Sequence, residues 1–137
     1  MRILAVDPGT RRVGLALSDP SGTIASPLGA VPAEPPESLP ERLANAAREH
    51  EAERIVVGLP VELDGKRGPA AVAAERLATQ LRRASGLPVE MMDERLTTAA
   101  AERTLIDAGM PREKRKKAVD SVAASLLLQT YLERKAR

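Results

Sequence analysis

The chain has 137 residues, of which 43% are hydrophobic and 1% aromatic, with a formal net charge of +2. This length suits a single compact domain, residues 1–137, with a core built from aliphatic side chains. The scarcity of aromatic residues argues against nucleic-acid readers that stack bases on aromatic platforms. The absence of cysteine excludes disulfides, thiolate zinc sites and a cysteine nucleophile.

The amino-terminal sequence lacks the layout of a signal peptide, because Met1 leads almost directly into an apolar stretch. No apolar run reaches the ~18 residues that a membrane-spanning helix needs. We therefore expect a cytoplasmic protein without a membrane partner. The charge is too mild to indicate a nucleic-acid partner by its sum, so the position of the charges matters more.

The first expected element is a pair of strands joined by a tight turn. An apolar run over residues 3–6 ends on Asp7, the sequence Pro8-Gly9-Thr10 turns the chain, and apolar residues then alternate up to Leu17. A buried carboxylate without a partner is costly. We therefore expect a cation or a metal ion beside Asp7.

An edge strand and a helix follow. Residues 23–31 can form a strand, and Pro27 places it at the edge of a sheet. The sequence Ser38-Leu39-Pro40-Glu41 predicts a helix that opens with a capping box and ends near His50. His50 is the single histidine, and we interpret it as a solvated residue at the end of that helix.

The second half of the chain alternates strands and helices. Residues 54–60 form a continuous apolar run, which indicates a strand buried on both faces. Pro69 opens a helix that Gly86 closes, and residues 89–92 form a short fifth strand. Such alternation requires parallel neighbouring strands joined by right-handed crossovers, so the whole chain is predicted to be a mixed α/β sandwich.

Two further helices are expected at the carboxyl end. Thr97 or Thr98 can cap the first of them, which stops at Gly109, and residues 112–117 then form a basic run. The last helix is predicted to bury one apolar side, made of Val119, Val122, Ala123, Leu126, Leu127 and Tyr131.

Three acidic positions lie where a sheet could gather them. Asp7 ends the first strand, Asp93 and Glu94 follow the fifth, and Asp120 lies in the first turn of the last helix. Ligands of open α/β sheets collect at the carboxyl ends of strands. Carboxylates suit Mg²⁺ or Mn²⁺, which act on phosphate esters. Asp93 and Asp120 also have simpler interpretations, since Asp93 can pair with Arg95 and Asp120 can complement the helix dipole. Asp7 is the hardest to explain in this way, because the strand around it is so apolar.

Basic residues on the loops near these acids predict an electrostatic groove for a nucleic-acid backbone. The run at 112–117 immediately precedes Asp120, so positive charge would lie beside the acidic site. Such a groove contacts phosphates and needs no readout of base edges. The loop residues that could contribute are Arg11, Arg12, Lys66, Arg67, Arg95, Lys116 and Lys117.

Four segments resemble, in order, the motifs of the YqgF/RuvX family, which are Holliday-junction-resolvase-like proteins also described as pre-16S rRNA nucleases. They are D-P-G-T-R-R-V-G-L-A-L-S-D at 7–19, V-G-L-P at 57–60 with D-G at 64–65, D-E-R-L-T-T at 93–98, and K-K-A-V-D-S-V-A-A-S-L-L-L-Q-T-Y-L at 116–132. The resemblance implies a ribonuclease-H-like fold, with a five-stranded mixed sheet of order 3-2-1-4-5 and helices on both faces. It also implies divalent-metal-dependent hydrolysis of phosphodiester bonds and a role in maturing the 5′ end of pre-16S ribosomal RNA.

The resemblance places the first and last metal ligands on Asp7 and Asp120. The middle acid would come from Asp93 or Glu94, and we prefer Glu94 for its longer reach. In related resolvases this acid stands on the fourth strand, which here reads Gly58-Leu59-Pro60. Strands are about 4.8 Å apart, so an acid after the fifth strand starts roughly 10 Å from Asp7. Either the loop bends Glu94 inward, or the site holds metal only with substrate bound.

We therefore predict a nuclease that uses Mg²⁺ or Mn²⁺. The metal ligands are Asp7, Glu94 and Asp120, with Asp93 or Glu62 as alternative acids, and the residues that hold the backbone are Arg11, Arg12, Arg95, Lys116 and Lys117. The expected partners are structured RNA or branched DNA, together with ribosomal precursor particles. The sequence leaves open whether the protein is a monomer or a dimer.

Three other functions are compatible with parts of the sequence. One is a nuclease acting on Holliday junctions or other branched DNA, or in DNA repair. Another is an RNA- or ribosome-binding module of the same fold without turnover, which the lack of an acid on the fourth strand favours. A third interprets D-P-G-T as the phosphate loop of an actin-like or sugar-kinase ATPase, but those folds are duplicated and this chain is long enough for one copy.

Overall fold

A computed structural model describes residues 1–61, 64–97, 99–109 and 119–136, with residues 99, 119 and 120 described by their backbone alone. Five strands form one mixed sheet of order β3-β2-β1-β4-β5. Strand β1 pairs antiparallel with β2 and parallel with β4; β2 and β3 are antiparallel, and β4 and β5 are parallel. This topology confirms the predicted strand order. The strands are β1 (Ile3–Asp7), β2 (Arg12–Ser18), β3 (Ala25–Pro32), β4 (Arg54–Leu59) and β5 (Val89–Asp93).

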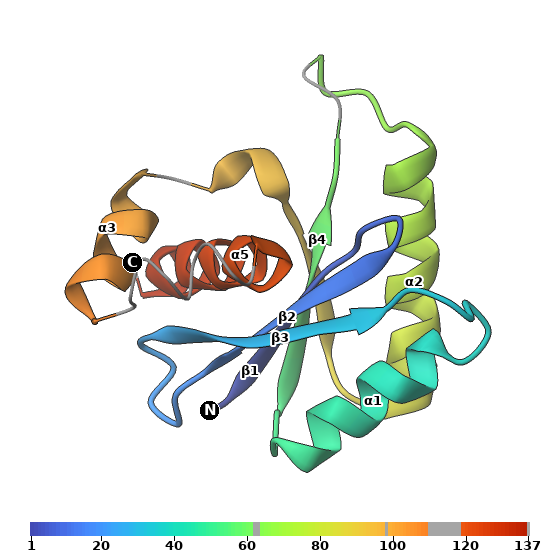
Figure 1. The fold of residues 1–137 in the computed structure, drawn as a ribbon, viewed down its shortest axis with the longest axis horizontal. Coiled ribbons are helices and arrows are strands. Elements are labelled where there is room, and N and C mark those ends of the chain that lie inside the picture. Colours follow the sequence, from blue (N-terminus) through green and yellow to red (C-terminus); the bar gives the residue numbers. More distant parts are fainter. Residues whose placement is uncertain (62–63, 98, 110–118, 137) are drawn as a thin grey trace.

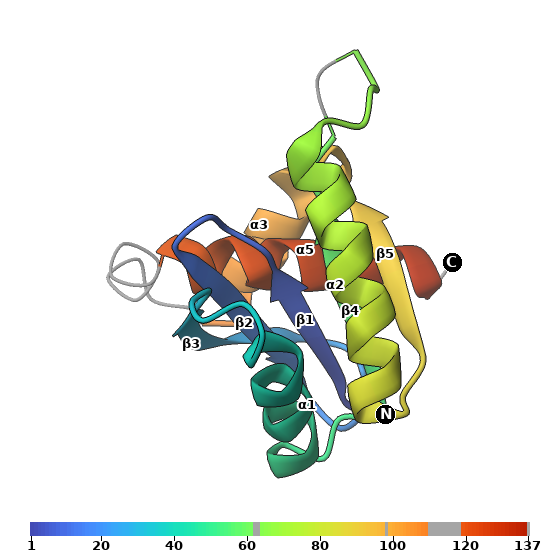
Figure 2. The same cartoon turned by 90° about the vertical axis from the view of Figure 1, so that its right-hand side faces the viewer.

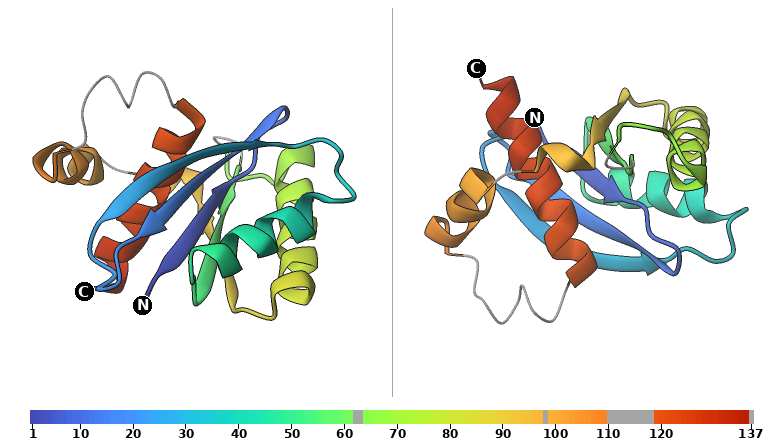
Figure 3. Two further views of the ribbon diagram at one scale, coloured as in Figure 1. Left: turned by 60° about the horizontal axis from the view of Figure 1, so that its bottom comes forward. Right: turned by 90° about the horizontal axis from the view of Figure 1, so that it is seen from above.

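Helices cover both faces of the sheet (Figure 1). Helices α1 (Leu39–Glu49) and α2 (Pro69–Ser85) lie together on one face (Figure 2). Helix α5 (Val119–Lys135) crosses the strands on the other face, with α3 (Ala99–Asp107) beside it (Figure 3). A short 3-10 helix, η1 (Glu94–Leu96), follows β5 directly. In the described ranges no helix has both the length and the apolar character that crossing a membrane requires.

The alternation of side chains along β1 determines the direction of Asp7. Leu4 packs in the core beneath α1 and α2, whereas Ala5 packs in the core beneath α5. Because successive residues of a strand point to opposite faces, Asp7 lies on the same face as Ala5. The continuous apolar run therefore reflects a strand covered on both sides, and it ends with a carboxylate on the α5 side.

Helix α1 begins and ends where the sequence predicts, but the predicted capping box at its start is wrong. Ser38 has a helical backbone, with φ −93° and ψ −9°, because residues 35–38 already form a tight turn. Its hydroxyl donates to the Pro35 carbonyl at 3.2 Å and accepts from Arg42 Nε at 3.0 Å. An N-cap side chain needs an extended backbone to reach the first free amides.

The predicted buried side of α5 is also partly wrong. Ala123 is exposed, and Val122 and Leu126 are half-buried. The buried face instead includes three polar residues spaced by four, which are Ser121, Ser125 and Gln129. Val119, also predicted on that face, has a side chain outside the described residues.

The polar residues are buried because they satisfy backbone groups of the sheet. The register between β2 and β3 shifts at Leu15, which marks an irregularity of the β-bulge type. There the Ser121 hydroxyl donates to the Leu15 carbonyl at 2.7 Å and accepts from the Gly29 amide at 2.8 Å. Gln129 Oε1 likewise accepts from the Ala25 amide at 2.9 Å. These contacts fix α5 on the sheet, including its first turn, in which residue 120 lies.

Ser121→Ala is expected to lower the free energy of unfolding by about 1–3 kcal/mol, because it leaves the buried Leu15 carbonyl and the partly buried Gly29 amide without this partner. Urea unfolding of the two proteins measures the difference. Ser125→Ala is the matched control, since that buried hydroxyl only donates to the Ser121 carbonyl within the same helix. Equal losses in the two variants would contradict this explanation of the polar face.

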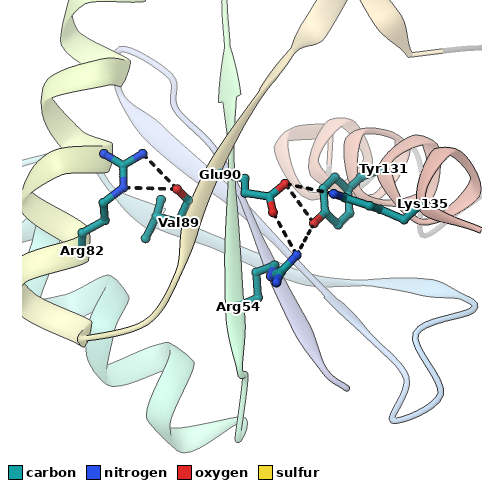
Figure 4. A network of polar contacts seen from close by, with 6 residues as sticks. All are labelled: Arg54, Arg82, Val89, Glu90, Tyr131 and Lys135. Atoms are coloured by element: carbon teal, nitrogen blue, oxygen red, sulfur yellow. Dashed lines mark hydrogen bonds and ion pairs between the residues drawn. The ribbon is translucent and has the colours of Figure 1, made fainter.

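A second polar contact holds the other end of α5 to strands β4 and β5 (Figure 4). Arg54 Nη1 donates to Glu90 Oε1 at 2.9 Å and to the Tyr131 hydroxyl at 3.1 Å. The Tyr131 hydroxyl donates to Glu90 Oε2 at 3.1 Å, and Lys135 Nζ lies 3.7 Å from the same oxygen. Helix α5 is thus fixed near both ends, which holds its middle above the ends of β1 and β4.

Candidate active site

Asp7 lies at the carboxyl end of β1, where a tight turn begins. Its side chain is half-buried on the α5 face. A Cβ atom at Gly9 would lie 2.4 Å from the Arg12 carbonyl oxygen, so the turn has room only for glycine there. The Ala33 amide donates to the Arg11 carbonyl at 2.9 Å and ties this turn to the chain after β3. The turn therefore fixes the carboxyl end of β1, the central strand of the sheet.

Glu94 comes from the first residue of η1, and its side chain turns back over the sheet toward Asp7. The two acids line one cavity of about 230 Å³, together with Thr97 and with Ala123, Leu126 and Leu127 of α5. The bend of Glu94 that the sequence left open is thus present in the structure. It brings the carboxyl group of Glu94, directly after the fifth strand, to the carboxyl group of Asp7 at the end of the first strand.

The Glu94 carboxyl reaches Asp7 by crossing β4 at Gly58. A Cβ atom built on Gly58 would lie 2.5 Å from Glu94 Oε1, so the carboxyl rests directly on the glycine. The Oε1 atom is buried and has no hydrogen-bond partner within the described part of the chain. A buried acceptor of this kind is costly unless a proton or a cation satisfies it.

Burial raises the pKa of Glu94 from its ordinary value of 4.5 to about 8. The neighbouring Asp7 carboxyl adds to this rise, as does the charge of Asp93. Two carboxyl groups that share a site cannot easily ionise together, so one keeps its proton. Without a cation, Glu94 is therefore the acid that stays protonated near neutral pH.

We expect the free energy of unfolding of the metal-free protein to fall as the pH rises from about 4.5 to about 8. The folded state holds the Glu94 proton more tightly than the unfolded state does. The stabilisation from this proton is therefore fully present below pH 4.5 and is lost as the pH rises through about 8. Urea unfolding across this range, with a chelator, measures the slope. Glu94→Gln cannot ionise and should flatten it; identical slopes in both proteins would contradict the assignment.

The donors of this site fit a hard divalent cation. Two carboxyl groups with an unsatisfied buried oxygen supply the oxygen ligands and the negative charge that Mg²⁺ and Mn²⁺ prefer. Among the described side chains there is no group of three acids, histidines or cysteines able to hold a metal. Asp120 lies in the first turn of α5, and its side chain is outside the described part. Helical spacing puts positions 120, 123 and 127 on one stripe of α5, and the last two line the cavity.

Asp93 takes a different role from Glu94 in the structure. Its Oδ1 accepts the Arg95 amide at 2.8 Å and caps η1, while Arg95 Nη2 donates to its Oδ2 at 2.6 Å. The hydrogen bond from Arg95 lowers the pKa of Asp93. Asp93 does not line the cavity that holds Asp7 and Glu94. This arrangement favours Glu94 as the middle acid and matches the simpler interpretation of Asp93.

The predicted basic groove is only partly described. Arg11 is exposed on the turn after Asp7, Arg12 is exposed at the start of β2, and Arg95 is exposed within η1. Arg67 donates to Glu75 at 2.7 Å on α2, which draws it toward that helix. Lys116, Lys117 and the alternative acid Glu62 lie outside the described residues.

Two residues of the site were not identified from the sequence. Gly58 gives Glu94 its path, and Ser121 fixes the start of α5 on the sheet. The available signal for Gly58 was a glycine inside an otherwise apolar, fully buried strand, which often marks a close approach. The signal for Ser121 was the polar residue repeated every four positions along the last helix.

Comparisons with known proteins show the family and the fold to which the chain is similar. Residues 1–134 match the model of a family described as "RuvX: Holliday junction resolvase". A relative from Chloroflexus aurantiacus (strain ATCC 29366 / DSM 635 / J-10-fl), named "Putative pre-16S rRNA nuclease", is 46% identical over 96% of this chain and 86% of its own length. A relative of the same name from Streptococcus sanguinis (strain SK36) is 42% identical over 98% and 99%. The structure of Thermus thermophilus RuvC with a Holliday junction substrate covers 98% of this chain and 96% of its own, with a TM-score of 0.62 and 16% identity, which shows a shared fold.

Proposed function

Because this chain belongs to the RuvX family, we propose that it is a divalent-metal-dependent nuclease that hydrolyses phosphodiester bonds in the 5′-end processing of pre-16S ribosomal RNA. The observation that carries the proposal is the meeting of the Asp7 and Glu94 carboxyl groups above Gly58, at the carboxyl ends of the central strands. The names of the curated relatives support the choice of RNA substrate.

Asp7, Glu94 and Asp120 would hold Mg²⁺ or Mn²⁺ in this proposal. A divalent ion bound there supplies Lewis-acid stabilisation of the charge that develops on phosphate oxygens. The chain itself contributes the negative charge that retains the ion. It also contributes an apolar wall, since Leu126 and Leu127 of α5 line the cavity beside the acids. A raised pKa of Glu94 also means that bound metal and bound proton compete for the same carboxyl group.

Basic residues around the site would orient the substrate through its phosphates. Arg11 and Arg12 follow Asp7 on the exposed turn, and Arg95 follows Glu94, so positive charge flanks both acids. Lys116 and Lys117 would add charge before Asp120. Such contacts bind a backbone without reading bases, so structure in the RNA, or in a ribosomal precursor particle, would select the cleavage site. The cytoplasm, where bacterial ribosomal RNA precursors are made, is the compartment that this role requires.

The test compares two substrates at matched length: an RNA that spans the 5′ end of the pre-16S sequence, and a four-way DNA junction. Each is incubated with Mg²⁺, with Mn²⁺ and with a chelator. We expect metal-dependent cleavage of the RNA. Cleavage of the junction alone would replace this proposal with a branched-DNA nuclease, the activity that the family's description names. Binding of the RNA without cleavage of either substrate would indicate the non-catalytic module.

A further inference from the structure

Gly58 is a buried residue of β4 whose backbone conformation does not require glycine. In the parallel pair of β1 and β4, Val6 lies opposite Val57. The next residues of the two strands are Asp7 and Gly58, so Gly58 lies beside Asp7. On its other side Gly58 pairs with Met92 of β5. Gly58 is absent from the glycines with positive φ, so another residue could adopt its backbone conformation. A glycine inside a strand weakens the strand and often marks a place where another group approaches the backbone closely. We therefore attribute Gly58 to the space that a side chain would occupy.

The space above Gly58 is filled by Glu94. A Cβ atom at position 58 would lie 2.5 Å from Glu94 Oε1 and 3.1 Å from Glu94 Cγ. The same atom would lie 3.1 Å from Leu127 Cδ2, which closes the space from the side of α5. A methyl group on β4 would therefore collide first with the end of the Glu94 side chain. That end is flexible and can swing away, whereas the strand and the helix are held by their neighbours.

We propose that Gly58 is a positioning residue, whose missing side chain leaves the passage over β4 through which Glu94, directly after the fifth strand, reaches Asp7 at the end of the first. This inference rests on the proposed function for its meaning, because it assigns Glu94 to the metal site. It explains how the chain completes an acidic site without an acid on β4. A side chain at position 58 and the inward Glu94 exclude one another, so the site takes its middle acid from η1, directly after β5, only while position 58 is glycine.

The test uses the full chain with Gly58→Ala, and Val56→Ile as the matched control. Val56→Ile adds one carbon to the same strand and the same face of the sheet, two residues away, where Val56 packs in the core beneath α5. Metal-free crystal structures of both variants show where the Glu94 carboxyl lies. Calorimetry with Mn²⁺ then gives the affinity of each variant and of the parent.

We expect Glu94 to leave Asp7 in Gly58→Ala and to stay in Val56→Ile. We also expect Gly58→Ala to bind Mn²⁺ about tenfold to a hundredfold more weakly, the size of loss typical for residues that orient metal ligands. A Gly58→Ala structure in which Glu94 still lies against Asp7 and Leu127 has moved instead would overturn the inference. An affinity equal to that of the parent would do the same. If the parent itself binds no Mn²⁺, the proposed function fails, while the crystal structures still decide whether Gly58 positions Glu94.

Discussion

Asp7→Asn is expected to lower metal-dependent cleavage of the RNA precursor at least about a hundredfold, since even residues behind the ligands change activity by 10–100-fold. Asparagine keeps the shape of the side chain but removes the charge at the end of β1. The turn that follows depends on Gly9 and on the Arg11 carbonyl, neither of which the substitution changes. The fold should therefore remain, which far-ultraviolet circular dichroism and urea unfolding check.

Asp107→Asn is the matched control for this experiment. Asp107 is an exposed carboxylate at the last residue of α3, so the substitution changes the net charge by the same amount without touching the cavity. We expect its cleavage rate to stay near that of the parent. Unchanged cleavage by Asp7→Asn would remove Asp7 from the site, and an equal loss in both variants would reduce the effect to general electrostatics.

Glu94→Gln is expected to weaken both Mn²⁺ binding and cleavage at least about tenfold, whereas Asp93→Asn should change them little. The glutamine amide can donate to Asp7 and fill the same space over Gly58, so the substitution removes the charge and keeps the packing. Asp93 already uses its carboxylate to cap η1 and to bind Arg95. Cleavage assays and calorimetry on the two variants separate neighbouring acids that the sequence could not separate.

The reverse result has a clear meaning. If Asp93→Asn loses activity and Glu94→Gln keeps it, the metal is held on the Arg95 side of η1, and the cavity between β1 and α5 is a packing feature. A third outcome, in which both variants lose activity with unchanged Mn²⁺ affinity, would place both acids in substrate positioning and would contradict the ligand set of Asp7, Glu94 and Asp120.

The mixed α/β architecture and the place of Asp7 followed from simple properties of the sequence, whereas the order of the strands followed from the resemblance to the family. Continuous apolar runs over β1 and β4 indicate strands covered on both faces, and alternating strands and helices require parallel pairing. Pro69 and Gly86 mark the ends of α2, where Gly86 adopts φ 71°. These signals are local or periodic, so they can be interpreted without knowledge of the tertiary structure.

The parts that the sequence did not give depend on contacts between distant segments. The inward bend of Glu94 requires Gly58, which lies 36 positions earlier in the chain and on another strand. The polar face of α5 requires the irregular register between β2 and β3, because Ser121 binds the groups at that point. The failed capping box at Ser38 arose from the turn before it, which changed the backbone of the capping residue.

The most direct test of this account is a crystal structure of the parent protein soaked with Mn²⁺ above pH 8, where the raised pKa leaves Glu94 ionised. Anomalous scattering then locates the metal. The account predicts manganese bound by carboxylate oxygens of Asp7 and Glu94, with Asp120 completing the site from the first turn of α5. Manganese bound at Asp93 would contradict the account. A crystal soaked to saturation with Mn²⁺ that shows no metal between Asp7 and Glu94 would contradict it as well.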